Sequence, residues 1–225
     1  MTTAMPRAPL RIAVLISGGG SNLQALLDGC ASGLIPGEVV LVISNNPDAY
    51  GLERARKHGV PSRVIDHRLF TSRAFFDQAV AHTLEEVGAE LICLAGFMRV
   101  LTDDFVHYYA GRLLNIHPAL LPAFPGIHVQ RQALDAGVRF SGATVHFVVP
   151  EVDAGPIVIQ AVVPVLADDT HATLAARILR QEHRIYPLAV RWFAQGRLRV
   201  EEGRVRVLEG AEDGEMALIQ PMEGG

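Results

Sequence analysis

The chain has 225 residues, 49% of them hydrophobic, which is enough for a sizeable core in a single domain. The formal net charge is -4 without any long basic run, so nucleic acid is not expected as the main partner. No apolar run approaches the roughly 20 residues that a membrane span needs, and residues 1–9 lack the apolar core of a signal peptide. Cys30 and Cys93 show no metal-binding spacing. We therefore expect a cytoplasmic protein with no membrane attachment and no metal.

The first half of the chain alternates between apolar strands and helices. Strands are predicted at residues 11–17, 38–44, 61–66, 91–95 and 113–117, and helices near residue 23 and at residues 49–58, 72–87 and 102–109. This alternation predicts an α/β fold with an open, mostly parallel sheet and helices on both faces. Ligands bind such sheets beyond the carboxyl ends of the strands, so the residues that follow the strands are expected to share one rim.

The second half is expected to complete the same domain, because no linker divides the chain. A helix is predicted at residues 128–136, and strands at residues 143–149 and 157–165 with antiparallel pairing. A long helix at residues 173–194 and a hairpin at residues 197–208 follow. Residues 209–225 are rich in Gly and Glu, and we expect them to form a disordered tail.

Asn115 and His117 lie two residues apart in a predicted strand, so their side chains project to the same face. Pro118 follows and favours an extended His117. One interpretation is a catalytic pair, in which the amide holds a carbonyl oxygen and the imidazole moves a proton. The other is a strand end with a satisfied histidine. Asp153 lies in a Gly/Pro-containing loop, either as a turn former or as a carboxylate that stabilises protonated His117.

A glycine-rich stretch, residues 17–22, lies between the first strand and the first helix. A dinucleotide fingerprint would need glycine where Leu23 stands, and a Walker loop would need a lysine that the stretch lacks. Two interpretations remain: a simple phosphate site formed by Gly20, Ser21 and Asn22, or a tight turn with Ser21 as the helix N-cap.

Other polar residues give weaker signals on their own. The stretch 97–101 either lines a slot for a flat heterocycle or is ordinary core with one snorkelling arginine. His146 is expected as a satisfied strand histidine, and Glu182 and His183 as exposed residues of the long helix. Arg73 begins a predicted helix and has no special spacing.

Taken together, several stretches resemble the phosphoribosylglycinamide formyltransferase family. The matching stretches are residues 15–25, 51–55, 94–99, 114–118, 131–134, 145–148 and 181–187. Their order and spacing are specific, and the resemblance runs from about residue 11 to about residue 199. It implies formyl transfer from 10-formyltetrahydrofolate to the amine of glycinamide ribonucleotide, in purine synthesis. These two small molecules are then the expected partners, and a homodimer is one expected assembly.

The resemblance also implies a role for individual residues. A Rossmann-like half, about 11–110, would bind the nucleotide phosphate, and a second half, about 111–208, would complete the folate site. The residues that match the family's motifs are Gly20, Ser21 and Asn22 for the phosphate, Glu182 for the ribose, Arg73, Met98, Arg99, Val100, Leu101 and Asn115 for the folate, and Asn115, His117 and Asp153 for catalysis.

The sequence departs from the family's usual pattern at Ala119, Ala123, Val129-Gln130 and Ala154, which concerns loop contacts more than chemistry. A formyltetrahydrofolate hydrolase shares the catalytic core and uses water, but carries an N-terminal regulatory domain that we do not expect here. Methionyl-tRNA formyltransferase needs a further C-terminal domain and a basic surface. A non-catalytic folate or nucleotide binding protein does not require Asn115, His117 and Asp153 together.

Overall fold

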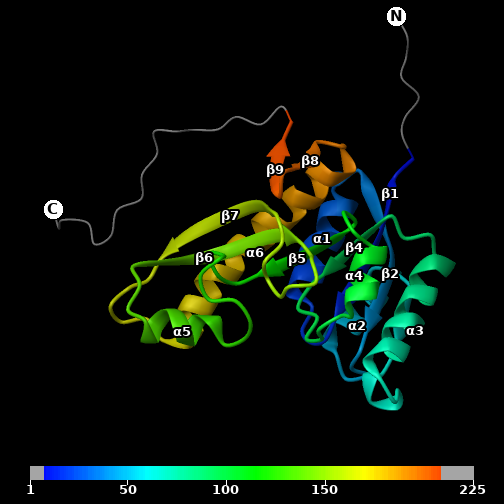
Figure 1. Ribbon diagram of the computed structural model, residues 1–225, viewed down its shortest axis with the longest axis horizontal. Helices are drawn as coiled ribbons and strands as arrows, with labels where there is room; N and C mark the ends of the chain where they lie inside the picture. The colour runs from blue at the N-terminus through cyan, green and yellow to red at the C-terminus, as the bar shows by residue number, and fades with distance from the viewer. Residues whose placement is uncertain (1–7, 209–225) are drawn as a thin grey trace, which may run out of the picture.

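The computed structural model describes residues 8–208. Within this range, seven strands form one sheet in the order β3-β2-β1-β4-β5-β6-β7, and two more form a separate hairpin (Figure 1). The strands are β1 Leu10–Ile16, β2 Gly37–Ser44, β3 Ser62–Val64, β4 Leu91–Leu94, β5 Leu113–His117, β6 Phe140–Phe147, β7 Ile157–Pro164, β8 Leu198–Glu201 and β9 Arg204–Val207. The helices are α1 Ser21–Ala31, α2 Tyr50–Lys57, α3 Arg73–Glu86, α4 Asp103–Tyr108, α5 Val129–Asp135 and α6 His171–Ala194, with a 3-10 helix at His67–Leu69.

The sheet changes direction at β5. Strands β1 to β5 pair in parallel, whereas β6 runs antiparallel to β5, and β7 antiparallel to β6. The carboxyl ends of five strands therefore meet at one edge of the sheet, where parallel α/β folds bind their ligands. The predicted fold class and the antiparallel pairing of the second half are confirmed.

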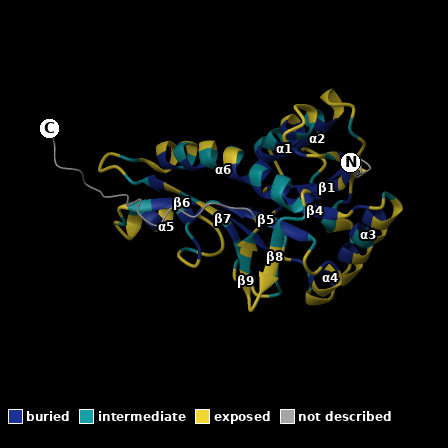
Figure 2. Ribbon diagram, turned by 90° about the horizontal axis from the view of Figure 1, so that it is seen from above, coloured by how far each residue is buried: buried dark blue, intermediate teal, exposed yellow. Residues whose placement is uncertain are grey.

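Helices cover both faces of the sheet because the central strand is apolar on both sides. Ile12 and Val14 of β1 pack into the core that includes α1 and α6, whereas Ala13 and Leu15 pack into the core that includes α3 and α4. Figure 2 shows these two pairs of helices on opposite sides of the sheet. All four side chains are fully buried, and burying a large aliphatic side chain contributes about 1.5–3 kcal/mol.

Hydrogen bonds stabilise the long helix α6 at its N-terminus and near its middle. At its N-terminus Thr170 and Thr173 form a reciprocal capping box. Farther along, the buried Tyr186 hydroxyl lies 3.0 Å from the Leu94 carbonyl oxygen and 3.1 Å from that of Leu114. The helix is thereby fixed against the end of β4 and the start of β5.

The predicted elements all occur, with small shifts at their ends. The strand predicted at residues 143–149 lies at Phe140–Phe147. The strand predicted at residues 61–66 covers only Ser62–Val64, because Asp66 caps the 3-10 helix by accepting the Arg68 amide. The expected tail, residues 209–225, lies outside the described residues. Of the helices in residues 8–208, none combines the length and apolar character needed to cross a membrane.

Both cysteines pack as small apolar residues. Burial raises the pKa of the Cys93 thiol to about 12 and that of Cys30 to about 11. Both thiols are free, and both are protonated at neutral pH.

Candidate active site

The glycine loop, residues 17–22, connects β1 to α1 at the carboxyl edge of the sheet. Gly20 is the N-cap of α1 with a φ of 69°, a left-handed conformation that favours glycine. No side chain caps this helix, so the alternative with Ser21 as N-cap is wrong. The first amides of α1, including those of Ser21 and Asn22, have no partner within the helix. They carry the partial positive charge that binds anions.

Helix α2 supports the glycine loop from behind. A Cβ on Gly20 would lie 2.7 Å from the Gly51 Cα, so neither backbone leaves room for a side chain at position 20. The Gly51 amide donates to the Gly18 carbonyl at 3.0 Å, and Arg54 Nε donates to the Gly19 carbonyl at 2.8 Å. These bonds engage carbonyls of the loop and do not use the amides of Gly20, Ser21 and Asn22, which can therefore bind a ligand.

Asn22 connects the glycine loop to α6. Its Nδ2 donates to Glu182 Oε2 at 2.6 Å, and both side chains are buried. Burial raises the pKa of Glu182, and the hydrogen bond from Asn22 offsets only part of that effect. The expectation that Glu182 would be exposed is therefore wrong: residue spacing on α6 does not reveal that α1 packs over this position. Oδ1 of Asn22 is buried with no partner among the described residues.

A polar cluster of Asn115, His117, His146 and Asp153 lies where β5 and β6 pair. In the antiparallel register Asn115 faces His146, and His117 faces Thr144. Asp153 comes from the loop between β6 and β7 and has a φ of 54°. The ladder of backbone hydrogen bonds thus fixes three members, and the loop brings the fourth to them.

Asp153 lies between the two histidines. Its Oδ2 is 3.4 Å from His117 Nδ1, and its Oδ1 is 3.6 Å from His146 Nε2. Burial raises the pKa of Asp153, but the hydrogen bond from the Gly126 amide and the charge of His117 are among the effects that lower it further. The net pKa lies below the ordinary value, so Asp153 is a carboxylate at neutral pH. The predicted approach of Asp153 to His117 is present.

The second nitrogen of His117 is already engaged. Nε2 lies 2.9 Å from the Phe124 carbonyl oxygen, an acceptor, so this nitrogen carries a proton. A protonated His117 satisfies both of its N–H groups here, one against Phe124 and one against Asp153. For His117 to donate to a substrate from Nε2, the Phe124 carbonyl has to move away. Such a change on binding is common, since catalytic hydrogen bonds are often formed fully only in the substrate complex.

His146 orients Asn115. His146 Nδ1 lies 2.9 Å from the Phe147 carbonyl oxygen and therefore donates, which leaves Nε2 of the neutral ring as an acceptor. That acceptor lies 3.2 Å from Asn115 Nδ2. One amide N–H of Asn115 is thus used to fix its orientation, and the second N–H remains for a ligand.

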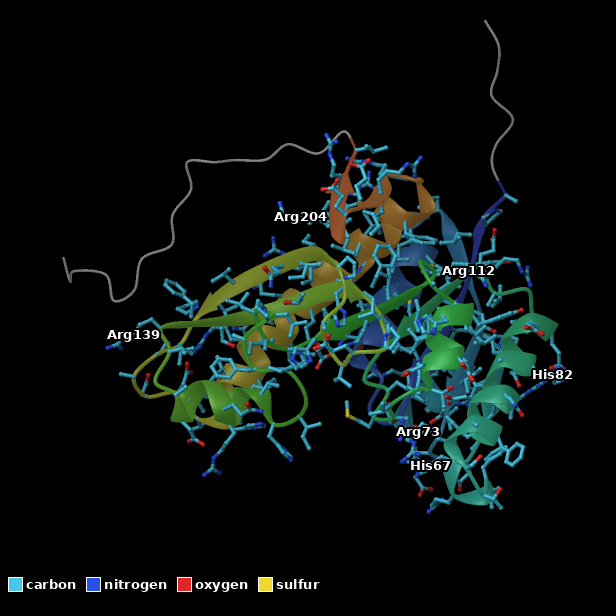
Figure 3. The ribbon with its side chains drawn as sticks, in the orientation of Figure 1. His67, Arg73, His82, Arg112, Arg139 and Arg204 are labelled. Atoms are coloured by element: carbon cyan, nitrogen blue, oxygen red, sulfur yellow. The ribbon has the colours of Figure 1, made fainter. Side chains whose placement is uncertain are left out.

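A cavity of about 720 Å³ opens beside the polar cluster. All four members of the cluster line it, as do Met98, Arg99, Val100 and Leu101 of the cavity loop, residues 96–101. The rest of the lining is largely apolar, and an apolar cavity of this size can bind a flat heterocycle. For residues 97–101, the structure therefore favours a ligand slot over ordinary core packing. Arg73, labelled in Figure 3, begins α3 and does not line this cavity.

Asp77 of α3 anchors the far end of the cavity loop. Its Oδ2 accepts the Thr102 amide at 2.6 Å, and the residue is 3% exposed. Burial raises the pKa of Asp77, against the hydrogen bonds from Thr102 and the charges of Arg73 and Arg99. Asp77 Oδ1 and Arg99 Nε are buried without a partner among the described residues.

Sequence reasoning missed the part of His146 in this cluster. A histidine that alternates with threonine on a strand gives no sign of its neighbours, and only the β5–β6 register places it opposite Asn115. Among residues 8–208, no group of three or more histidine, cysteine or acidic residues is arranged to hold a metal ion.

Comparison with known proteins identifies the family of the chain. The family described as formyl transferase matches residues 10–190. The chain belongs to this family. It is 50% identical over 193 residues to phosphoribosylglycinamide formyltransferase of Escherichia coli (strain K12), across 86% of this chain and 91% of that protein. It is also 50% identical to the trifunctional purine biosynthetic protein adenosine-3 of Bos taurus, of which it spans 19%.

Solved structures agree. Glycinamide ribonucleotide transformylase 1 from Symbiobacterium toebii superposes with a TM-score of 0.88 at 55% identity, covering 90% of this chain and 95% of that one. A formyltetrahydrofolate deformylase from Pseudomonas syringae pv. tomato has the same fold with a TM-score of 0.84, at 26% identity, covering 91% of this chain and 67% of that one. The family expected from the motifs is confirmed, and the chain resembles the transferases more closely than this deformylase.

Proposed function

We propose that the chain transfers the formyl group of 10-formyltetrahydrofolate to the amine of glycinamide ribonucleotide, in cytoplasmic purine synthesis. The observation that carries this proposal is that one edge of one sheet holds both an anion-binding loop and a cavity containing Asn115, His117 and Asp153. A transferase needs two adjoining sites, since holding two reactants side by side supplies much of the rate.

The ribonucleotide phosphate binds the amides of Gly20, Ser21 and Asn22 at the start of α1. Free N–H groups and the helix dipole both favour the phosphate there. Glu182, held by Asn22 at 2.6 Å, lies next to this loop and accepts hydrogen bonds from the ribose hydroxyls. The substrate amine then extends along the sheet edge toward the polar cluster.

The formylated folate occupies the cavity. Its pteridine lies against residues 98–101, and its formyl group lies next to Asn115. Arg73, outside the cavity lining, binds an acidic part of the folate that extends beyond it. No metal takes part in this mechanism.

The substrate amine attacks the formyl carbon directly. A C–N bond forms, the carbonyl electron pair moves to oxygen, and the resulting oxyanion accepts hydrogen bonds from the second N–H of Asn115 and from protonated His117. As the bond between carbon and N10 of the folate breaks, His117 gives its proton to N10 and takes up in its place the proton that the amine loses. The Asp153 carboxylate, 3.4 Å from Nδ1, holds the imidazole in place and offsets its positive charge while it carries the proton.

A hydrolase that uses water is the alternative with the same polar cluster. Water needs no phosphate site, whereas here α2 and Glu182 both support the glycine loop. We therefore favour the ribonucleotide as the acceptor.

The test measures loss of the formyl group from 10-formyltetrahydrofolate by absorbance, with and without glycinamide ribonucleotide. We expect loss only when the ribonucleotide is present. Equal loss in its absence would make the protein a hydrolase, and no loss with the folate bound would make it a binding protein.

A further inference from the structure

One chain of hydrogen bonds crosses the carboxyl edge of the sheet and links loops that follow four strands. The Met98 amide, after β4, donates to Ser17 Oγ at 2.7 Å. The Ser17 hydroxyl, after β1, donates to Asn45 Oδ1 at 2.5 Å. Asn45, after β2, lies with Nδ2 3.1 Å from His67 Nδ1, after β3; His67 is labelled in Figure 3.

Ser17 holds the central place in this chain. Its hydroxyl has one proton and two lone pairs, and the structure uses the proton toward Asn45 and one lone pair toward Met98. Its backbone adds a second tie, because the Ser17 amide donates to the Gly96 carbonyl at 3.1 Å. Ser17 therefore forms hydrogen bonds with both Gly96 and Met98 of the cavity loop.

The hydrogen bond between Ser17 and Met98 joins the glycine loop to the cavity, which bind different ligands in the proposed function. Ser17 is the first residue of the glycine loop, and Met98 lines the cavity. Neither Ser17, Asn45 nor His67 lines the cavity, and the Ser17 side chain reaches the lining through its hydrogen bond to Met98. The other end of the cavity loop is fixed by Asp77 through Thr102. At its start, the side-chain hydrogen bond found among the described residues is the one from the Met98 amide to Ser17.

We infer that Ser17 is a positioning residue that couples the two substrate sites: occupation of the glycine loop by the ribonucleotide tightens binding of the folate through the bond from Ser17 to Met98. This inference rests on the proposed function, since it assigns the loop to the phosphate and the cavity to the folate. A phosphate that orders the glycine loop fixes the Ser17 hydroxyl, and this in turn fixes the Met98 amide. By linkage, the folate tightens binding of the ribonucleotide by the same factor.

The test is a binding cycle measured by calorimetry. Tetrahydrofolate carries no formyl group, so its affinity can be measured with and without glycinamide ribonucleotide and without turnover. In the wild type we expect the ribonucleotide to tighten tetrahydrofolate binding about fivefold or more, the lower end of site-to-site couplings. In Ser17→Ala we expect less than about twofold, and Ser17→Thr, which keeps the hydroxyl, restores the coupling.

The matched control is Ser32→Ala, which removes a serine hydroxyl bonded to the Gly29 carbonyl at the end of α1 and leaves the coupling intact. Circular dichroism checks the fold of each variant. If Ser17→Ala fails to fold, Asn45→Ala takes its place, because it removes the acceptor of the Ser17 hydroxyl and is also expected to lower the coupling.

Two results would overturn the inference: a wild type that binds both ligands without coupling, or a folded Ser17→Ala with wild-type coupling. Both leave the proposed function standing as long as the wild type transfers formyl to the ribonucleotide. A wild type that binds neither ligand would instead defeat the proposed function.

Discussion

The glycine loop and the polar cluster lie at the same edge of one sheet but use different parts of the polypeptide. The loop is contiguous, offers backbone amides, and depends on the absence of a side chain at Gly20, where Gly51 approaches. The cluster gathers charged and polar side chains from β5, β6 and the following loop. Substitutions should therefore separate the two regions, with the loop governing affinity for the ribonucleotide and the cluster governing turnover.

The largest effect is expected from Asp153→Asn. The amide cannot stabilise a protonated His117, so turnover should fall roughly 10²-fold or more, the scale of a general acid–base contribution. The readout is kcat from the absorbance assay at saturating substrates, with the KM for ribonucleotide nearly unchanged. Glu151→Gln, an exposed carboxylate in the same loop, is the matched control. Wild-type turnover in Asp153→Asn would exclude this carboxylate from catalysis.

His117→Ala should lower turnover by a similar factor of roughly 10²-fold, because the developing oxyanion loses a charged donor. Groups that act as a unit are not additive, so His117→Ala combined with Asp153→Asn should be little worse than the more damaging single variant. Steady-state kcat values for the three variants form the cycle. If the loss of kcat in the double variant equals the product of the two single losses, the two side chains act independently.

Gly20→Ala should weaken the other region. The new Cβ would lie 2.7 Å from the Gly51 Cα and require a left-handed alanine, which costs about 1–2 kcal/mol. The KM for ribonucleotide should rise about tenfold, while calorimetric affinity for tetrahydrofolate alone stays the same. Gly18→Ala is the control, since a Cβ there meets nothing within 4 Å. Equal loss of both affinities would contradict a separate phosphate site.

The smallest effect concerns Asp77, which belongs to neither region but holds the cavity loop. Burial raises its pKa above the ordinary 3.8, so the ionised carboxyl costs stability. This cost appears as pH rises from the unfolded value through the raised folded value, and it is complete above that. Asp77→Asn keeps an acceptor for the Thr102 amide and cannot ionise.

We therefore expect Asp77→Asn to raise Tm by about 2 °C at pH 7 and to leave it unchanged at pH 3. Calorimetric melting at both pH values measures this, with the exposed Asp168→Asn as control. A gain that persists at pH 3 would point to packing instead of ionisation.

The contrast between the glycine loop and the polar cluster also separates the features that the sequence predicts from those that it does not. The glycine loop and the pair Asn115 and His117 could be predicted, because each is encoded within a few residues and a strand period of two sets the shared face. The sequence also located the strands, since their apolar runs are long and bounded by glycine and proline.

What the sequence did not reveal depends on contacts across the fold. His146 meets Asn115 only through antiparallel register, and Glu182 is buried only because α1 packs over α6. The contact of His117 with the Phe124 carbonyl depends on the path of the loop after β5. No local pattern encodes these distances.

The raised pKa values of both thiols have a practical consequence. Because Cys30 and Cys93 are the chain's two cysteines and both pKa values are raised, a cysteine introduced at the surface would react selectively with a maleimide dye. Met98→Cys would place that dye at the mouth of the cavity, where the native side chain is 67% exposed. Motion of the cavity loop can then be followed by fluorescence without replacing the native cysteines.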